Sequence, residues 1–314
     1  MWWIRLKNLL ASKICFKSMN FIEKICLGTA QFGSSYGLTN KNNELSVEEI
    51  GEILSLAKYN GISFLDTAPS YGNAEFKLGN IDIRDWNIVT KVKTGKNIST
   101  DNAFSRSVED SLNRLKIDNL YGVLIHDPKL IYHPQINSLL NQLSELKDKG
   151  LIKKIGVSVY DSVEVDFILG NFDVDIIQIP FNIIDGRMME NNTLDKLKRR
   201  NIEVHARSIY LQGLLLMDIK NQTQQFGNWE SIWKLFNSFC IDNKITPLEA
   251  CLRYVLHNPQ IDRVILGIDN YSQLEETIES ATGGDVNVPI ELISLDDNLC
   301  NPSNWEMYSH LRLS

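Results

Sequence analysis

Cysteine is scarce in this sequence of 314 residues, and its five copies show no C-x-x-C spacing. They are Cys15, Cys26, Cys240, Cys251 and Cys300. An odd set without a pattern predicts neither a disulfide framework nor a cysteine zinc site, and it fits a reducing cytoplasm best. The histidines show no H-x-x-x-H spacing either. We therefore expect a cytoplasmic protein without a bound metal.

The sequence also lacks a long apolar run and a long basic run. Without about twenty consecutive apolar residues, no membrane-spanning helix is predicted. The net charge is −7, and the longest basic cluster is LKRR at 197–200. Because phosphate binding needs a cationic surface, this charge pattern argues against a nucleic-acid partner.

The first twenty residues differ from the rest because they carry four basic residues and no acidic one. Lys13 and Lys17 interrupt any apolar run suited to export, and no small-residue cleavage site follows them. We therefore interpret residues 1–20 as a basic N-terminal extension and residues 21–314 as a single domain.

Short β-branched segments alternate with longer amphipathic segments along this domain. The predicted strands are residues 24–28, 63–66, 87–91, 121–126, 154–159, 175–180, 203–208 and 263–267. The predicted helices are residues 47–59, 103–115, 136–149, 163–169, 189–200, 229–243, 247–257 and 272–280. Strands that are apolar almost throughout indicate a parallel sheet covered on both faces, and a run of this length predicts a (β/α)8 barrel. The alternative is a doubly wound open sheet, which is disfavoured because no G-x-G-x-x-G opens any helix.

Polar residues close three successive predicted strands. Asp66 ends SFLD, Lys91 ends NIVTK, His126 ends YGVLIH, and Tyr71 lies in the loop APSYG. Taken singly, each has a structural explanation, such as capping a helix or reaching solvent from the barrel rim. In (β/α)8 barrels, however, chemistry takes place at the C-terminal ends of the strands. Separate structural needs do not account for an acid, a phenol, an amine and an imidazole at three successive strand ends, so the group favours an active site.

Seven ordered segments between Lys24 and Ala281 resemble the aldo-keto reductase superfamily. They are LGTAQFG at 27–33, FLDTAPSYG at 64–72, IVTKV at 88–92, SVEDSLNRLKIDNLYGVLIHDP at 107–128, GLIKKIGVSVYD at 150–161, IIQIPFN at 176–182 and VILGIDNYSQLEET at 264–277. The resemblance implies an enzyme that transfers a hydride between a nicotinamide cofactor and a carbonyl or alcohol. It also implies a catalytic tetrad of Asp66, Tyr71, Lys91 and His126.

The chemistry explains why these residue types are needed. Hydride delivery to a carbonyl carbon builds negative charge on its oxygen, so a proton donor must lie within hydrogen-bonding distance. Tyr71 is the expected donor, although an unperturbed phenol has a pKa of about 10. The ammonium group of Lys91 would stabilise the phenolate. Asp66 would hold Lys91 in place, and His126 would orient and polarise the carbonyl.

The same resemblance implies the residues that bind NADP(H) or NAD(H). They are Gly28, Thr29, Ser158, Gln178, Arg207, Gly267, Gln273 and Glu276. Ser158 and Gln178 match the residues that bind the carboxamide, although Val159 stands where an asparagine is common. Arg207 replaces an aromatic residue, and a planar guanidinium can also stack on the nicotinamide.

The choice between the two cofactors stays open. Gly267 and Gln273 stand where the family often has Lys or Arg for the 2′-phosphate, and Asp269 adds negative charge nearby. The family favours NADP(H), whereas these residues favour NAD(H) or relaxed use. Arg263 and the start of the last helix near Ser272 could still attract a phosphate.

Two other functions are compatible with parts of the sequence. The family includes subunits that hold the cofactor and mainly regulate a partner, and Lys91 could be the nucleophile of a Schiff-base aldolase. For the enzyme, we expect a small-molecule carbonyl substrate and either a monomer or a homo-oligomer. LGTAQFGSSYGLTN and the NPSNW tail resemble bacterial members of surface-polysaccharide and unusual-sugar biosynthesis. The first expectation is therefore a sugar or sugar nucleotide, with simple aldehydes as the alternative.

Overall fold

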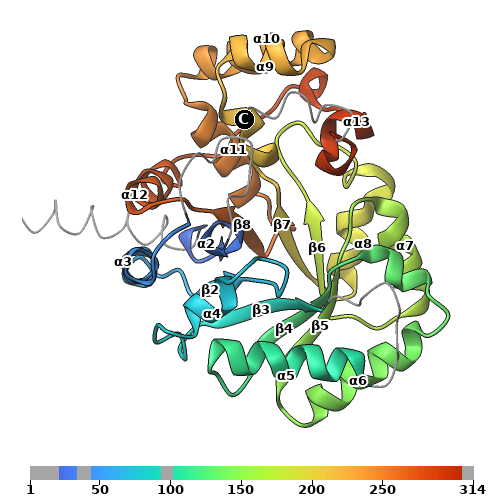
Figure 1. The fold of residues 1–314 in the computed structure, drawn as a ribbon. Helices are drawn as coiled ribbons and strands as arrows, with labels where there is room; N and C mark the ends of the chain where they lie inside the picture. The colour runs from blue at the N-terminus through green and yellow to red at the C-terminus, as the bar shows by residue number, and fades with distance from the viewer. Residues whose placement is uncertain (1–20, 34–43, 93–101, 306–314) are drawn as a thin grey trace, which may run out of the picture.

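Eight parallel strands close into a barrel in the computed structural model, which describes residues 21–33, 44–92 and 102–305. The strands are β1 (Ile25–Gly28), β2 (Phe64–Asp66), β3 (Asn87–Val92), β4 (Leu120–Ile125), β5 (Ile152–Ser158), β6 (Ile176–Pro180), β7 (Glu203–Arg207) and β8 (Arg263–Gly267). They are ordered β1 to β8 around the barrel, and β8 pairs with β1 to close it. The predicted single-domain (β/α)8 barrel is confirmed (Figure 1).

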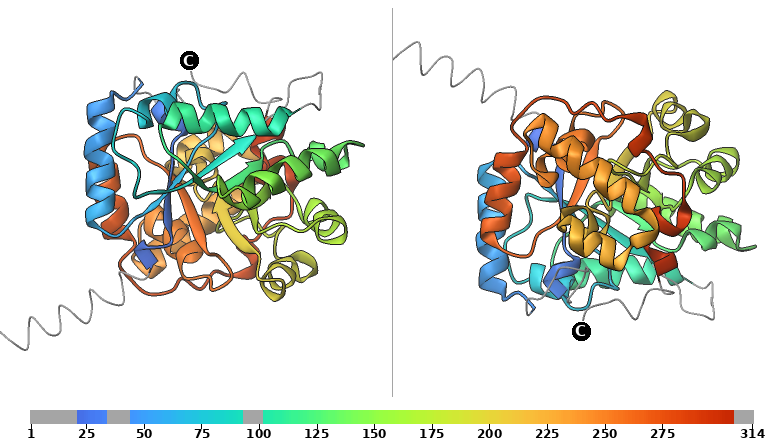
Figure 2. Two further views of the ribbon diagram at one scale, coloured as in Figure 1. Left: turned by 90° about the horizontal axis from the view of Figure 1, so that it is seen from below. Right: turned by 90° about the horizontal axis from the view of Figure 1, so that it is seen from above.

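Helices surround the strands. The longer ones are α3 (Val47–Tyr59), α5 (Ala103–Leu115), α6 (Ile136–Asp148), α7 (Ser162–Asn171), α8 (Thr193–Arg199), α10 (Glu230–Asn243), α11 (Pro247–Leu256) and α12 (Tyr271–Ser280). The shortest ones are α2 (Ala30–Gly33), α4 (Ala74–Leu78) and α13 (Asp297–Cys300), and α9 (Ile219–Gln225) is as long as α8. Figure 2 shows α3 and α12 side by side next to the β1–β8 pair, so the two ends of the domain meet where the barrel closes.

Local sequence explains where several helices begin. Ser46 and Thr246 each form a capping box with the glutamate three residues later, Glu49 and Glu249. The predicted helix over 189–200 is wrong at its start, because Asn191 and Asn192 have φ angles of 53° and 54°. Asparagine tolerates this left-handed conformation, which interrupts an α-helix.

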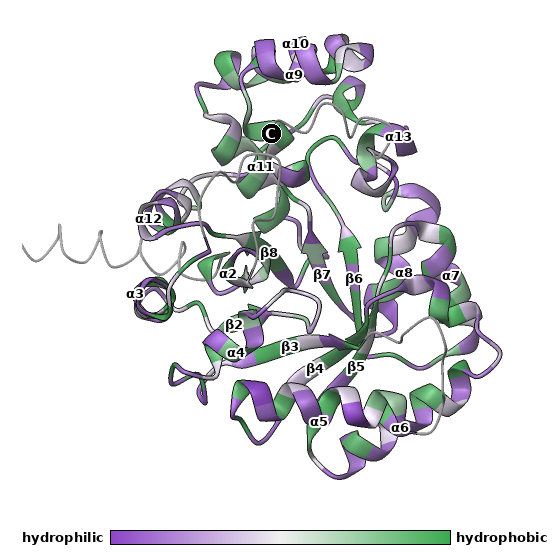
Figure 3. Cartoon of the chain, in the orientation of Figure 1, coloured by the Kyte–Doolittle hydropathy of each residue, from purple (hydrophilic) through white to green (hydrophobic). Residues whose placement is uncertain are grey.

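The apolar residues lie in two places relative to the barrel wall. Inside the barrel, Val89, Leu124 and Ile176 form a small buried cluster. A much larger cluster lies between the strands and the surrounding helices. Figure 3 shows hydrophobic residues along the strands, whereas α5 and α6 carry both hydrophobic and hydrophilic residues. This distribution is expected of helices that cover a parallel sheet with one face.

A second buried cluster joins the C-terminal elements. Trp233 and Phe236 of α10 are buried in it, together with Phe226 and Trp305. Figure 1 shows α9 and α10 beyond α11, at the end of the molecule that also carries α13. Residues 209–225, for which no helix or strand was predicted, contain the 3-10 helix η3 (Leu211–Leu216) and α9.

Two expectations concern segments outside the barrel. The proposed basic extension over residues 1–20 lies outside the described residues. Within the described ranges, every helix is too short or too polar to cross a membrane.

Candidate active site

The barrel brings the four predicted catalytic residues to one end of the molecule. Asp66 is the last residue of β2, and Lys91 is the last but one of β3. His126 follows β4 directly, and its backbone N–H donates to the Val92 carbonyl at the end of β3 (3.1 Å). Tyr71 lies in the loop between β2 and α4. Because parallel strands end at the same rim, residues far apart along the chain become neighbours, such as Ser70 and His126, which are 56 positions apart.

Lys91 and Asp66 form a buried ion pair. Their exposed fractions are 1% and 3%, and Lys91 Nζ lies 2.5 Å from Asp66 Oδ1. Nζ also donates to the Thr67 carbonyl at 3.0 Å. Burial alone would lower the pKa of Lys91, but the charges of Asp66 and Tyr71 and their hydrogen bonds raise it above its ordinary value. Lys91 is therefore held as a cation, which disfavours the neutral amine that a Schiff-base aldolase needs.

Tyr71 lies next to both the cation and the imidazole. Lys91 Nζ is 4.9 Å from the centroid of the Tyr71 ring. The Tyr71 and His126 rings are perpendicular, with centroids 6.0 Å apart. His126 Nδ1 also lies 3.3 Å from Ser70 Oγ. A phenol, an ammonium ion and an imidazole are thus grouped at the barrel mouth, as proton transfer to a carbonyl oxygen requires.

The two residues expected to bind the carboxamide contact each other and the ion pair. Ser158 and Gln178 stand opposite one another in the β5–β6 register. Ser158 Oγ donates to Gln178 Oε1 at 3.2 Å, and Gln178 Nε2 donates to Asp66 Oδ2 at 2.8 Å. One hydrogen-bonded chain therefore joins Ser158 and Gln178 to Asp66 and Lys91.

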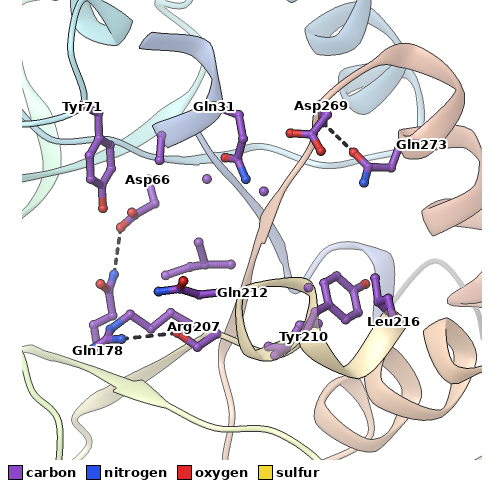
Figure 4. A pocket seen from close by; sticks show the side chains of 17 residues that line it. Gln31, Asp66, Tyr71, Gln178, Arg207, Tyr210, Gln212, Leu216, Asp269 and Gln273 are labelled. Atoms are coloured by element: carbon purple, nitrogen blue, oxygen red, sulfur yellow. Dashed lines mark hydrogen bonds between the residues drawn. The ribbon is translucent and has the colours of Figure 1, made fainter. Parts of the chain in front are cut away.

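A cavity of about 180 Å³ opens beside this group (Figure 4). Seven of the predicted site residues line it: Gly28, Asp66, Tyr71, Gln178, Arg207, Gly267 and Gln273. The other five do not line it: Thr29, Lys91, His126, Ser158 and Glu276. Of these, Lys91, Thr29 and Ser158 are buried within the protein, whereas Glu276 is exposed on α12.

Arg207 reaches the cavity from the end of β7, but its guanidinium already has protein partners. Its Nη2 donates to the Val159 carbonyl at 2.9 Å, and the group lies 4.7 Å from the centroid of the Tyr160 ring. The protein thus supplies an aromatic ring on which Arg207 stacks. Stacking of Arg207 on nicotinamide stays a prediction.

Sequence reasoning missed the part of the cavity wall that follows β7. Tyr210, Gln212, Gly213 and Leu216 line the cavity there, and Gln31 lines it from α2. Gln212 and Gly213 have φ angles of 55° and 92°, so this 3-10 segment is kinked. Gly213, inside the apolar run LQGLLL, was the signal that could have indicated an irregular loop.

Comparison with known proteins identifies the family. The sequence profile of the Aldo/keto reductase family matches residues 24–283. The chain belongs to this family. It is an NAD(P)H-dependent oxidoreductase, as the sequence predicted.

Two distant relatives and one solved structure match most of the length of this aldo-keto reductase. An uncharacterised oxidoreductase of Bacillus subtilis (strain 168), YqkF, is 27% identical over 287 residues, which are 83% of this chain and 87% of that protein. The L-galactose dehydrogenase of Arabidopsis thaliana is 26% identical over 281 residues, covering 83% and 85%. A solved aldo-keto reductase from Bacillus halodurans, in its holo form, has a TM-score of 0.64 at 18% identity and covers 92% of this chain and 91% of its own.

The polar atoms around the cavity of this aldo-keto reductase fit a nicotinamide dinucleotide. Among the described residues, four buried side-chain oxygen atoms lack a hydrogen-bond partner: Thr29 Oγ1, Thr67 Oγ1, the Tyr210 hydroxyl and Asp269 Oδ1. Thr67 adjoins Asp66, which lines the cavity. Tyr210 and Asp269 also line the cavity, and Thr29 adjoins Gly28, which lines it. Buried polar atoms without partners are costly, so their grouping here indicates that a polar ligand completes the site.

Proposed function

We propose that this aldo-keto reductase reduces a small carbonyl compound to an alcohol, and runs the reverse oxidation, with Tyr71 as the general acid and base. The observation that carries the proposal is that Tyr71 lines the cavity next to a buried cation. The centroid of its ring lies 4.9 Å from Lys91 Nζ. A nicotinamide dinucleotide supplies or accepts the hydride when bound. The residues of the chain then have to transfer the proton and stabilise the negative charge on the substrate oxygen.

Tyr71 donates its hydroxyl proton to the substrate oxygen as negative charge develops there. Lys91 makes this easier because a nearby cation stabilises the phenolate that remains. Asp66 keeps Lys91 charged and in place through their 2.5 Å contact. His126 donates a second hydrogen bond to the substrate oxygen and so fixes which atom Tyr71 meets. In the oxidation, the Tyr71 phenolate takes the proton back.

Ser158 and Gln178 hold the carboxamide of the cofactor in this proposal. Gln178 lines the cavity and is itself fixed by hydrogen bonds to Ser158 and Asp66. Because hydrogen bonds hold the Gln178 amide on both sides, its remaining N–H points in one direction. A carboxamide bound to it therefore presents one face of the nicotinamide ring to the substrate. Gly28 and Gly267 pair in the β1–β8 register and line the adjacent part of the cavity, where the Gln31 amide occupies the space that a side chain at Gly267 would need.

The substrate we propose is a sugar or a sugar derivative. Support comes from the L-galactose dehydrogenase among the relatives and from the resemblance of the LGTAQFGSSYGLTN segment and the NPSNW tail to sugar-biosynthesis members. Several polar side chains reach the cavity, among them Gln31, Gln212 and Arg207, and they suit a ligand rich in hydroxyl groups.

The test is turnover of Tyr71→Phe with a panel of aldoses, keto-sugars and simple aldehydes. Loss of the proton donor should reduce turnover about 10²- to 10⁴-fold, while the affinity for the reduced cofactor stays within a factor of about two. Tyr59→Phe is the matched control, because Tyr59 is 89% exposed on α3. Full turnover by Tyr71→Phe would refute the assignment. Cofactor binding without turnover of any carbonyl by the unaltered protein would favour the regulatory-subunit alternative.

A further inference from the structure

We propose that Asp269 makes this enzyme select NAD(H) over NADP(H), by accepting a hydrogen bond from the free 2′-hydroxyl of the adenosine ribose. This inference rests on the proposed function, since it requires a dinucleotide in the cavity. It goes further by assigning which dinucleotide binds and which side chain decides.

Asp269 lies at the end of the cavity away from the catalytic group. It follows β8 by two residues and precedes α12, whose N-cap is Asn270. Figure 4 shows Tyr71 and Asp66 on one side of the cavity and Asp269 and Gln273 on the other. Because the reactive ring must lie beside Tyr71, the remainder of an extended dinucleotide runs toward Asp269.

The carboxylate of Asp269 has an acceptor to spare. Its Oδ1 is buried and has no hydrogen-bond partner within the part of the chain that the structure describes. Burial raises the pKa of Asp269, although a hydrogen bond with Gln273 opposes this. A buried acceptor at the cavity wall is suited to a hydroxyl donor and unsuited to a phosphate dianion.

Side chains at the start of α12 occupy two backbone N–H groups that could otherwise have met a 2′-phosphate, those of Asp269 and Gln273. Gln273 Oε1 accepts from the Asp269 backbone N–H at 2.5 Å, and Asn270 Oδ1 accepts from the Gln273 N–H at 2.9 Å. The first turn of α12 is therefore capped by its own side chains. Ser272, suggested by the sequence as a phosphate contact, does not line the cavity.

The cations are also poorly placed for a phosphate beside Asp269. The expectation that Arg263 attracts the phosphate was wrong. Arg263 is the first residue of β8, whereas Gly267, at the other end of this strand, lines the cavity. The Arg263 guanidinium instead lies 3.9 Å from the centroid of the Phe64 ring. Among the described residues that line the cavity, Arg207 is the one cation, and Figure 4 shows it on the side of Gln178. A carboxylate without a nearby cation disfavours a 2′-phosphate.

The test is an equilibrium titration of the full chain with NADH, NADPH and 2′-deoxy-NADH, in which the fluorescence of the nicotinamide reports binding. For the unaltered protein we expect NADH to bind at least about tenfold more tightly than either of the other two, the usual effect of one charge-assisted hydrogen bond. Asp269→Asn should reduce the ratio of the NADPH dissociation constant to the NADH dissociation constant at least about tenfold. Glu275→Gln is the control, because Glu275 is exposed on α12 and does not line the cavity.

Each outcome is decisive. Equal affinity of the unaltered protein for NADH and NADPH would overturn the inference, and so would equal affinity for NADH and 2′-deoxy-NADH. These two measurements need no variant, so poor folding of Asp269→Asn cannot obscure them. Failure of all three ligands to bind would instead refute the proposed function.

Discussion

Gln178 donates a hydrogen bond of 2.8 Å to Asp66, whose other carboxylate oxygen holds Lys91. The two residues are 112 positions apart, on β6 and β2, and both are buried. An amide expected to bind the cofactor thus also satisfies the carboxylate that keeps the catalytic cation charged. Any change at Gln178 should therefore affect the protein as well as the ligand.

Gln178→Met tests this double role. Removing the donor leaves Asp66 Oδ2 buried without that partner, which should lower the free energy of unfolding by about 1–3 kcal/mol. Urea denaturation measures the change, and NADH titration should show weaker binding in the same variant. Gln224→Met, at an exposed position of α9, is the control. Unchanged stability of Gln178→Met would contradict the role assigned to the hydrogen bond.

Lys91→Met separates the structural and chemical contributions of the ion pair. Alone, it leaves the buried Asp66 carboxylate uncompensated and should cost about 3–5 kcal/mol of stability. Adding Asp66→Asn removes that charge, so the double variant should recover most of the loss. Turnover should stay reduced at least about 10²-fold in both variants, because neither has a cation beside Tyr71. Recovery of turnover in the double variant would show that Lys91 has no chemical role.

Gly33→Ala should move the loop that carries Tyr71. A Cβ atom at Gly33 would lie 1.9 Å from the Tyr71 carbonyl oxygen, and one at Gly72 would lie 2.0 Å from the Gly33 carbonyl oxygen. The loop must therefore shift, and a displacement of about 1 Å can reduce turnover about 10²-fold. We expect this loss in kcat, with a smaller change in cofactor affinity.

Gly51→Ala is the matched control for that variant. It lies within α3, and an added Cβ there meets no atom within 4 Å. It should leave turnover unchanged and raise stability by about 0.5–1 kcal/mol, because alanine favours a helix interior. Equal turnover of the two alanine variants would show that close packing at Gly33 does not position Tyr71.

Acid stability should depend on Glu203, at the start of β7. Burial would raise the pKa of Glu203, but His205, Lys154 and Tyr121 outweigh it and lower the pKa from 4.5 to about 2. A lowered carboxylate pKa stabilises the fold above pH 4.5, and this stabilisation is lost as the pH falls from 4.5 toward 2. Thermal unfolding should show this loss between those values, with a flatter profile for Glu203→Gln. Glu230→Gln, at an exposed position of α10, should keep the steep profile.

The alternation of apolar strands with amphipathic helices was enough to predict the barrel, because each unit has to bury its strand on both faces. The limits of α3, α5 and β8 were predicted to the residue. The start of α8 was missed because the period of apolar residues does not reveal that two asparagines adopt a left-handed conformation. The loop over η3 was missed because an apolar segment such as LQGLLL does not reveal by period that it is kinked.

The sequence by itself determined which residue types close the strands, and so it predicted the group of Asp66, Tyr71, Lys91 and His126. Only the tertiary structure decided that Gln178 contacts Asp66, that Gly33 packs on the Tyr71 loop, and that Asp269 rather than Arg263 faces the cavity. The physical reason is that strand order and period follow from local patterns of hydrophobicity. Contacts between side chains of distant strands depend instead on the register with which the barrel closes.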